Sequence, residues 1–239
     1  MSGLPMNTYV LVHGGWSGAH GFRTVRRLLT VAGHEVFTPS LTGVGERVHL
    51  LSPMVDLTTH IHDVVNTVLY EDLDEIVLVG FSYGGAVVTG AVDHIAGRIR
   101  ELVYLDAFVP GDGDSVAGLA GRSRTQLLSL AQEWLVPPPP RPFDDPEEGA
   151  WQNARRGSHP ARCFTEPVRL TMPLEQQRFG LTFVKATKDG RESPGGEAFW
   201  TAAEHAHGSD RWKYFEIATT HMVASNRPDE LARILVELA

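Results

Sequence analysis

A serine flanked by glycines ends an apolar run in the segment LVGFSYGGAV (78–87). A serine hydroxyl becomes an effective nucleophile when an adjacent base takes its proton. The pattern GFSYG follows a predicted strand and opens a predicted helix, which is the setting of a nucleophile elbow. Glycine at positions 80 and 84 avoids a collision of side chains at the sharp bend. We therefore predict that Ser82 is a catalytic nucleophile held clear at the sheet edge.

The base for this serine must come from the eleven histidines of the chain. If the order is serine, acid, histidine, the candidates are His94, His159, His205, His207 and His221. His221 lies just after the last predicted strand, in ATTHMVASNRP, at the edge that should carry Ser82. The other candidates fall in predicted helices or in a long insertion. We therefore predict that His221 is the general base.

Two aspartates end predicted strands at this same edge of the sheet. Asp106 closes the apolar run ELVYLD, where a carboxylate is costly unless it has a partner such as an imidazolium. Asp189 lies in the polar stretch TKDGRESPGG, which has the composition of a solvated turn. We favour Asp106 as the acid that orients the histidine and keep Asp189 as the alternative.

The glycine turn HGGW (13–16) follows the first predicted strand and can supply a hydrogen-bond donor. Because positions 14 and 15 carry no side chain, the backbone there can approach a ligand closely. The helix that follows Ser82 directs further N–H groups and a partial positive charge to the same place. We predict that the N–H groups of Gly15 and Tyr83 form an oxyanion hole, with Trp16 N–H as the alternative donor.

These residues need a scaffold that brings strand ends together. Short apolar β-rich runs alternate with helical patterns, among them a helix with Asp56 as N-cap, and this predicts an α/β fold with a mostly parallel sheet covered by helices on both faces. Residues 107–178 exceed an ordinary connection; they hold a helix candidate over 124–136 and the run PPPPRPFDDP. We expect residues 1–106 and 179–239 to form the core and 107–178 to be an inserted lid over the ligand-binding edge.

Aromatic side chains of the insertion and of the glycine turn are candidates for the wall of a substrate pocket. They are Trp16, Trp134, Phe143, Trp151 and Phe164. The competing interpretation is that the aromatic side chains of the insertion form a small core of the lid. An apolar lid favours a small or medium ester, or a lactone, over a charged substrate.

Composition and charge exclude several other classes of function. The formal net charge of −8 argues against a nucleic-acid surface. No apolar run reaches the roughly 20 residues that span a bilayer, and the N-terminus lacks a signal-peptide pattern, so we expect a cytoplasmic location. The single cysteine, Cys163, leaves no internal disulfide. The pairs His60/His62 and His205/His207 diverge on helices, and no carboxylate completes a site at ligand spacing, so we expect no metal. We also expect no cofactor, and a homodimer is left open.

Over nearly its whole length the chain resembles the α/β-hydrolase superfamily, through VLVHGGW, GHEVFTPSLTGVGER, IVLVGFSYGG, ELVYLDAFVP and TTHMVASNRPDELA. It is similar to bacterial members of the small esterases related to plant methyl-ester esterases and hydroxynitrile lyases. The resemblance implies that Ser82 is the nucleophile and His221 the base. It divides over the acid, because the plant branch would match Asp189, whereas other branches place the acid about 24 residues after the nucleophile, as Asp106 is.

The function expected from these residues is hydrolysis of a carboxylic ester or lactone, with a small molecule as partner and with neither nucleic acid nor a membrane involved. Two other interpretations remain. A lyase on the same scaffold would use Ser82 and His221 for proton transfer without an acyl-enzyme. A non-catalytic receptor would bind a small ligand with a disabled triad, and it would show tight binding without turnover.

Overall fold

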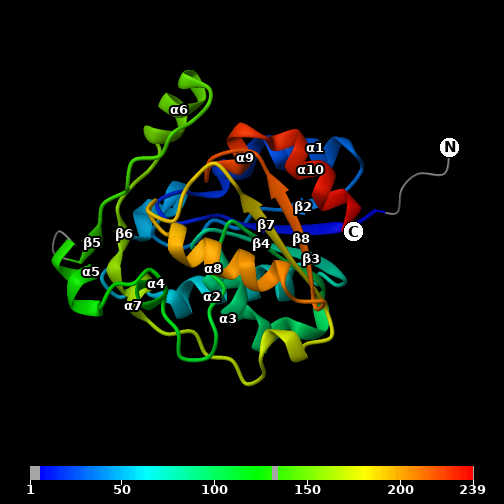
Figure 1. Cartoon of the computed structure of the whole chain (residues 1–239), viewed down its shortest axis with the longest axis horizontal. Helices are drawn as coiled ribbons and strands as arrows, with labels where there is room; N and C mark the ends of the chain where they lie inside the picture. The colour runs from blue at the N-terminus through cyan, green and yellow to red at the C-terminus, as the bar shows by residue number, and fades with distance from the viewer. Residues whose placement is uncertain (1–5, 131–133, 239) are drawn as a thin grey trace.

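A parallel β-sheet forms the centre of the computed structural model, which describes residues 6–130 and 134–238 (Figure 1). Within these residues the sheet has six strands in the order β2-β1-β3-β4-β7-β8, and all neighbouring strands are parallel. The strands are β1 (Thr8–Val12), β2 (Glu35–Phe37), β3 (Ile76–Phe81), β4 (Ile99–Leu105), β7 (Gly180–Ala186) and β8 (Trp212–Ile217). All six therefore end at one edge of the sheet.

Helices cover both faces of this sheet. On one face lie α2 (Leu57–Tyr70), α3 (Gly84–Ile95) and α8 (Gly196–His207); on the other lie α1 (Arg23–Val31) and α10 (Pro228–Glu237) (Figure 1). The side chains of β1 alternate between the two cores, with Val10 and Val12 in the first and Tyr9 and Leu11 in the second. Burial on both faces explains the nearly continuous apolar runs of the strands. The predicted α/β fold with a parallel sheet is confirmed.

Local signals in the sequence set where several helices begin. The carboxylate of Asp56 accepts the backbone N–H of Thr59 at 3.0 Å and caps α2, as predicted. Pro228 is the first residue of α10, a position where its missing N–H loses no helical bond. The short helices outside the long insertion are η1 (Ala19–Phe22), η2 (Gly45–Leu50), η3 (Ala96–Arg98) and α9 (Val223–Asn226).

The chain between β4 and β7 adds no strand to the central sheet in its described part. Its elements are α4 (Val116–Leu119), α5 (Arg124–Leu130), β5 (Leu135–Val136), α6 (Pro146–Asn153), β6 (His159–Pro160), α7 (Ala161–Thr165) and η4 (Leu174–Gln176). The helix predicted over 124–136 is present as α5, and 131–133 lie outside the described residues. The prediction was wrong for 135–136, which pair antiparallel with 159–160. The proline run that follows disfavours a helix there.

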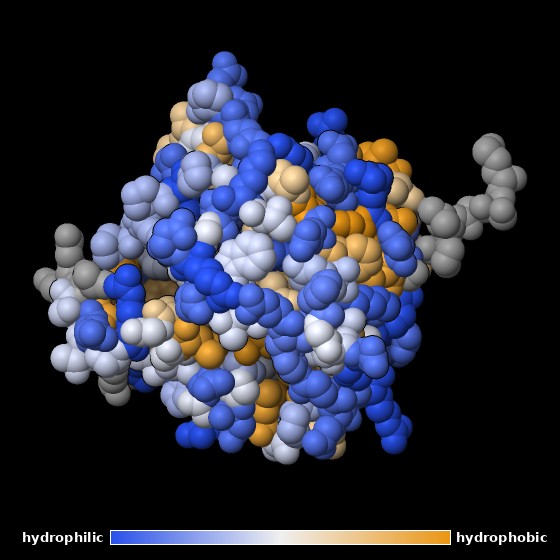
Figure 2. All heavy atoms as spheres, viewed as in Figure 1, coloured by the Kyte–Doolittle hydropathy of each residue, from blue (hydrophilic) through white to orange (hydrophobic). Residues whose placement is uncertain are grey.

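The face of the molecule in Figure 2 is mainly hydrophilic, with apolar areas between hydrophilic residues. Among the described helices, none combines the length and the apolar character needed to cross a membrane. The two ends of the described chain lie on the same side of the molecule, away from α5 and α6 (Figure 1).

Candidate active site

Three side chains that the sequence places far apart meet at the carboxyl edge of the sheet. Ser82 follows β3, Asp106 follows β4, and His221 lies between β8 and α9. His221 Nε2 is 3.0 Å from Ser82 Oγ, and His221 Nδ1 is 2.7 Å from Asp106 Oδ2. All three are buried. The arrangement is a continuous hydrogen-bonded chain from hydroxyl to imidazole to carboxylate.

The turn at Ser82 has the backbone conformation that its glycine neighbours permit. Ser82 has φ 55°, in the left-handed region that side chains rarely adopt. A Cβ on Gly80 would lie 2.7 Å from the Gly84 carbonyl oxygen, and one on Gly84 would lie 2.6 Å from the Val12 carbonyl oxygen. Glycine is therefore required at both positions, and the bend lifts the Ser82 hydroxyl toward His221.

Asp106 also sits at a special point of the backbone, with φ 41° directly after β4. Its second oxygen, Oδ1, accepts a hydrogen bond from Lys185 Nζ at 2.7 Å, and both side chains are 1% exposed. Burial raises the pKa of Asp106, but the hydrogen bond and charge of His221 together with Lys185 outweigh this and hold the pKa below its usual value. The carboxylate is therefore ionised and its charge is balanced by a buried ammonium.

The imidazole of His221 is held between two aromatic rings. The Phe199 ring stacks on it at a centroid distance of 5.0 Å, and the Phe81 ring lies at 4.7 Å. Burial, followed by the charge of Arg141, lowers the pKa of His221 to about 4, against the opposing effect of Asp106. His221 is therefore neutral at physiological pH, the form that can accept a proton from a hydroxyl.

Asp189 contacts His221 in a different way. Its Oδ2 accepts the backbone N–H of His221 at 2.8 Å, while the ring of His221 faces Asp106. Asp189 therefore holds the loop that carries the histidine and does not contact the imidazole. Of the two candidate acids, geometry pairs Asp106 with the ring.

The glycine turn lies beside the elbow. A Cβ on Gly15 would lie 3.6 Å from the Tyr83 Cβ, and the N–H groups of Gly15 and Tyr83 have no acceptor among the described residues. The alternative donor, Trp16 N–H, donates instead to His159 Nδ1 at 3.2 Å. The alternative prediction, that the Trp16 N–H binds an oxyanion, does not fit this structure, because that N–H already donates to His159.

A cavity of about 550 Å³ opens above Ser82. Trp16 and Phe164 line it, together with Phe108, Phe199 and other apolar side chains. Trp134, Phe143 and Trp151 were predicted to line the pocket, but they do not. Phe143 packs against Gly149 of α6, and the Trp151 ring lies between the guanidinium groups of Arg23 and Arg155. Trp134 precedes β5, where its carbonyl accepts the N–H of Ala161.

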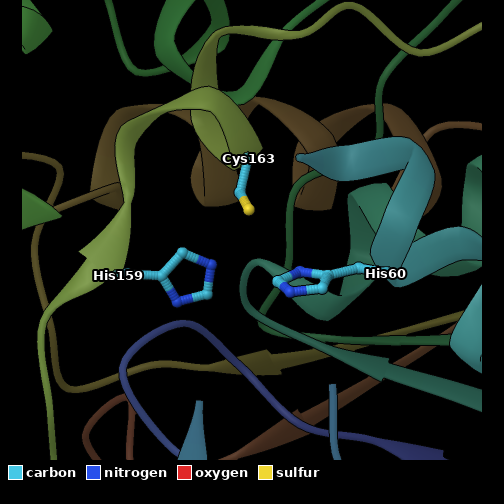
Figure 3. Close-up of side chains that lie close together, drawn as sticks. All are labelled: His60, His159 and Cys163. Atoms are coloured by element: carbon cyan, nitrogen blue, oxygen red, sulfur yellow. The ribbon is translucent and has the colours of Figure 1, made fainter. Parts of the chain in front are cut away.

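Next to this cavity, two histidines and a cysteine form a second buried cluster (Figure 3). His60 comes from α2, His159 from β6 and Cys163 from α7, and their candidate ligand atoms lie within 4.8 Å of one another. The cysteine side chain points toward the two rings. Burial raises the pKa of the Cys163 thiol and lowers the pKa of both histidines, so the thiol is protonated and the rings are neutral.

The hydrogen bonds of this cluster decide whether a metal would fit. His60 Nε2 donates to the Thr42 carbonyl at 2.8 Å, so its Nδ1 is the acceptor for the Tyr83 hydroxyl at 2.9 Å. His159 Nδ1 accepts from Trp16, so the proton of the neutral ring is on Nε2. A metal would have to displace the Tyr83 hydroxyl or break the Trp16 bond and deprotonate the thiol. The arrangement instead fixes the Tyr83 hydroxyl and ties β6 to the glycine turn that follows β1.

Sequence reasoning missed three side chains around the site. Lys185 looks like an ordinary strand residue in GLTFVKAT, and its contact with Asp106 depends on the register of β7 against β4. Phe199 is one of several apolar residues of α8. Arg141 follows the proline run, and no local pattern signals that it lines the cavity of Ser82. Only the non-local packing reveals all three.

The fold and the elbow define the class of protein: an α/β protein with a hydroxyl–imidazole–carboxylate chain at the carboxyl edge of a parallel sheet. The chain belongs to the alpha/beta hydrolase family, whose model matches residues 9–234.

Individual relatives agree with this membership. The chain is 54% identical over 114 residues to a carbendazim hydrolyzing esterase of Nocardioides sp. (strain SG-4G), a match covering 48% of this chain and 47% of the relative. It is 31% identical over 103 residues to the alpha-hydroxynitrile lyase of Arabidopsis thaliana, covering 43% and 40%. These matches span less than half the length of each relative.

A solved structure is similar over nearly the whole chain. It is an extracellular alpha/beta-hydrolase from a Paenibacillus species, with a TM-score of 0.80 and 22% identity, covering 98% of this chain and 99% of the other. At this level of identity the likeness concerns the fold.

Proposed function

We propose that this protein is a serine ester hydrolase that cleaves a small or medium, largely apolar carboxylic ester or a lactone through an acyl-enzyme. The observation that carries the proposal is the chain of hydrogen bonds from Ser82 through His221 to Asp106. The esterase named among the relatives supports the same class of reaction. The mostly apolar wall of the cavity above Ser82 suits an uncharged reacting centre.

In the first half of the proposed reaction, His221 Nε2 takes the Ser82 proton as Oγ attacks the ester carbonyl carbon. The developing oxyanion accepts hydrogen bonds from the free N–H groups of Gly15 and Tyr83, each contributing on the order of 3 kcal/mol to lowering the barrier. The imidazolium formed on His221 is stabilised by Asp106 and then protonates the departing alcohol. The acyl group remains on Ser82.

In the second half, water replaces the alcohol. His221 takes a proton from the water, the resulting hydroxide attacks the acyl carbon, and His221 returns the proton to Ser82 Oγ as the acid leaves. In this proposal the segment 107–178 acts as a lid: its Phe164 contacts Trp16 of the glycine turn, with ring centroids 5.0 Å apart, and the two rings exclude water from one wall. Phe199 contributes to the wall and stacks on His221.

A same-fold lyase is the second candidate, favoured by the match to a hydroxynitrile lyase. It would use Ser82 and His221 to move a proton and would release its product without acylating the serine. The two candidates differ in one observable, a covalent acyl group on Ser82.

The test is a rapid-quench experiment with p-nitrophenyl butyrate, followed by mass spectrometry of the protein. We expect a butyryl adduct on the peptide that contains Ser82, and a loss of kcat of about 10⁴-fold or more in Ser82→Ala. The control is Ser40→Ala, which removes a similarly buried hydroxyl bonded to Glu46, outside the site; its kcat should stay near that of wild type. Unchanged turnover in Ser82→Ala contradicts the proposal. A wild-type protein that neither hydrolyses the ester nor acquires the adduct, but cleaves an α-hydroxynitrile in a Ser82-dependent way, favours the lyase.

A further inference from the structure

Two cations at the cavity above Ser82, Arg122 and Arg141, form no ion pair with a described residue; Arg122 is exposed, whereas Arg141 is partly buried. Arg191 also lines the cavity, but it is ion-paired with Glu197 and Glu204. Arg141 is partly buried, and its one described hydrogen bond runs from Nη2 to the Pro194 carbonyl at 3.0 Å. No described carboxylate comes within ion-pair distance of it. A guanidinium has five N–H donors, so most of those on Arg141 are available to a ligand.

The free donors of Arg141 face accessible space. Several side-chain nitrogens elsewhere in the described chain are buried from solvent and have no hydrogen-bond partner, among them two of Arg100. No nitrogen of Arg141 is among them. Burial and the charge of Arg156 lower the pKa of Arg141 to about 10, against the opposing charges of Asp189 and Asp106, so the group remains charged at neutral pH. A desolvated cation beside a cavity favours a strong acceptor or an anion as its partner.

The position of this cation relative to His221 bears on catalysis. The charge of Arg141 opposes protonation of the His221 ring. In the proposed reaction that ring must become an imidazolium in the transition state, so the charge of Arg141, which forms no direct ion pair with a described residue, raises the barrier. A negative group bound at Arg141 removes this penalty and improves the chemical step as well as binding.

We infer that Arg141 is the subsite for a carboxylate carried by the substrate, so that the preferred ester has an apolar body and one anionic end. The inference rests on the proposed function and narrows its substrate class. The apolar side chains of the wall, such as Phe164 and Phe199, hold the body, while the guanidinium binds the carboxylate through paired N–H donors. The expectation of an uncharged substrate is modified accordingly at one end of the cavity.

The experiment compares two p-nitrophenyl esters of equal length, the adipate half-ester with a free carboxylate and the adipamate with a terminal amide. In wild type we expect kcat/KM to be at least about tenfold higher for the half-ester, since a charged hydrogen-bonded pair is lost with the amide. Arg141→Met should bring the ratio of the two kcat/KM values close to one by lowering kcat/KM for the half-ester, and Arg141→Lys should keep part of the preference. Arg191→Met, which removes a paired cation of the same cavity, should leave the ratio unchanged.

Two further experiments test whether Arg141 serves an internal ion pair and whether the preference for a carboxylate is also seen without any variant. Glu133 lies outside the described residues, and Glu133→Gln should preserve the ratio; if it alters the ratio as Arg141→Met does, Arg141 serves an internal ion pair and the inference is overturned. Inhibition of wild type by hexanoate and by hexanamide needs no variant, and hexanoate should bind several-fold more tightly. Equal inhibition, or a ratio near one for wild type, overturns the inference. Loss of Ser82-dependent hydrolysis for both esters would instead contradict the proposed function.

Discussion

Strand β4 carries a buried carboxylate at each of its ends, and the two ends have different neighbours. Glu101 near the start of the strand is 3% exposed, and Asp106 just after its end is 1% exposed. Each is paired with a lysine from another strand: Lys213 Nζ is 3.0 Å from Glu101 Oε2, and Lys185 Nζ is 2.7 Å from Asp106 Oδ1. Judged by burial and charge pairing alone, the two ends look alike.

The difference lies in what the remaining carboxylate oxygen contacts. At the first end, Glu101 Oε1 accepts from the Thr182 hydroxyl, and Lys213 is half exposed to solvent. At the second end, Asp106 Oδ2 meets the His221 ring, which meets Ser82 below a cavity. Strained backbone occurs at Ser82 and Asp106 and not at Glu101. A buried carboxylate–lysine pair is therefore not a site by itself; the imidazole, the strained turns and the cavity distinguish one.

The largest contrast should come from neutralising each carboxylate in turn. Asp106→Asn disturbs the tautomer and orientation of His221, and we expect kcat for p-nitrophenyl butyrate to fall by about 10⁴-fold. Glu101→Gln keeps the Thr182 and Lys213 contacts within reach and should change kcat by no more than about threefold, with its main effect on stability. Steady-state kinetics with a thermal melt for each variant make the test. If Glu101→Gln lost as much kcat as Asp106→Asn at equal folding, the distinction between the two ends would fail.

The sequence reveals much of this arrangement where the signal is local. The pattern around Ser82 needs only a strand, a bend and a helix, which neighbouring residues encode. The parallel fold then brings the ends of β4 and β8 to the same edge, so Asp106 and His221 become candidates without coordinates. Burial at the end of an apolar run is enough to favour Asp106 over Asp189.

Features that depend on packing between distant segments could not be predicted in this way. The Trp16 N–H is occupied by His159, 143 positions away along the chain. Trp151 looks like a pocket residue by type, yet two guanidinium groups hold its ring elsewhere. Lys185 meets Asp106 only through the register of β4 with β7. Aromatic and charged residues of the irregular segment between β4 and β7 can pack and form hydrogen bonds in many ways, and composition does not determine which contacts form.

Acid should lower the free energy of unfolding through His221, which lies in the loop after β8. Burial lowers the pKa of His221 to about 4, below its ordinary value of 6.5, so the unfolded chain binds the proton first. The contribution to the free energy of unfolding is therefore complete above pH 6.5 and is lost as the pH falls to about 4, on the order of 3 kcal/mol. Urea titrations across this range should show a shallower pH dependence in His221→Gln. Thr182→Val, at the other end, should retain the wild-type slope; the same change of slope in both variants would contradict the assignment.

Removing each lysine tests how its charge acts on the neighbouring carboxylate. Without Lys185, the negative charge of Asp106 is no longer offset by the neighbouring ammonium, so Asp106 favours the His221 imidazolium more strongly. The acid limb of kcat/KM should therefore move upward by roughly one pH unit. Lys185→Met should also lower the melting temperature, because a buried carboxylate loses its partner. Lys213→Met is the matched control, and its acid limb should coincide with that of wild type. An unmoved limb in a folded Lys185→Met protein would show that the charge of Lys185 does not reach His221.

We expect the smallest change in kcat from Asp189→Asn. This variant should shift the acid limb of kcat/KM in the direction opposite to that of Lys185→Met. Asp189 accepts the backbone N–H of His221, a bond that an asparagine oxygen can still make, so Asp189→Asn should lower kcat by no more than about threefold. The charge of Asp189 raises the pKa of His221, so its removal should move the acid limb downward, opposite to Lys185→Met. Asp189→Ala, which also removes the acceptor, should cost about tenfold in kcat through the loosened loop. A loss in Asp189→Asn as large as that in Asp106→Asn would transfer the role of the acid to Asp189 and break the comparison on which the two ends of β4 are distinguished.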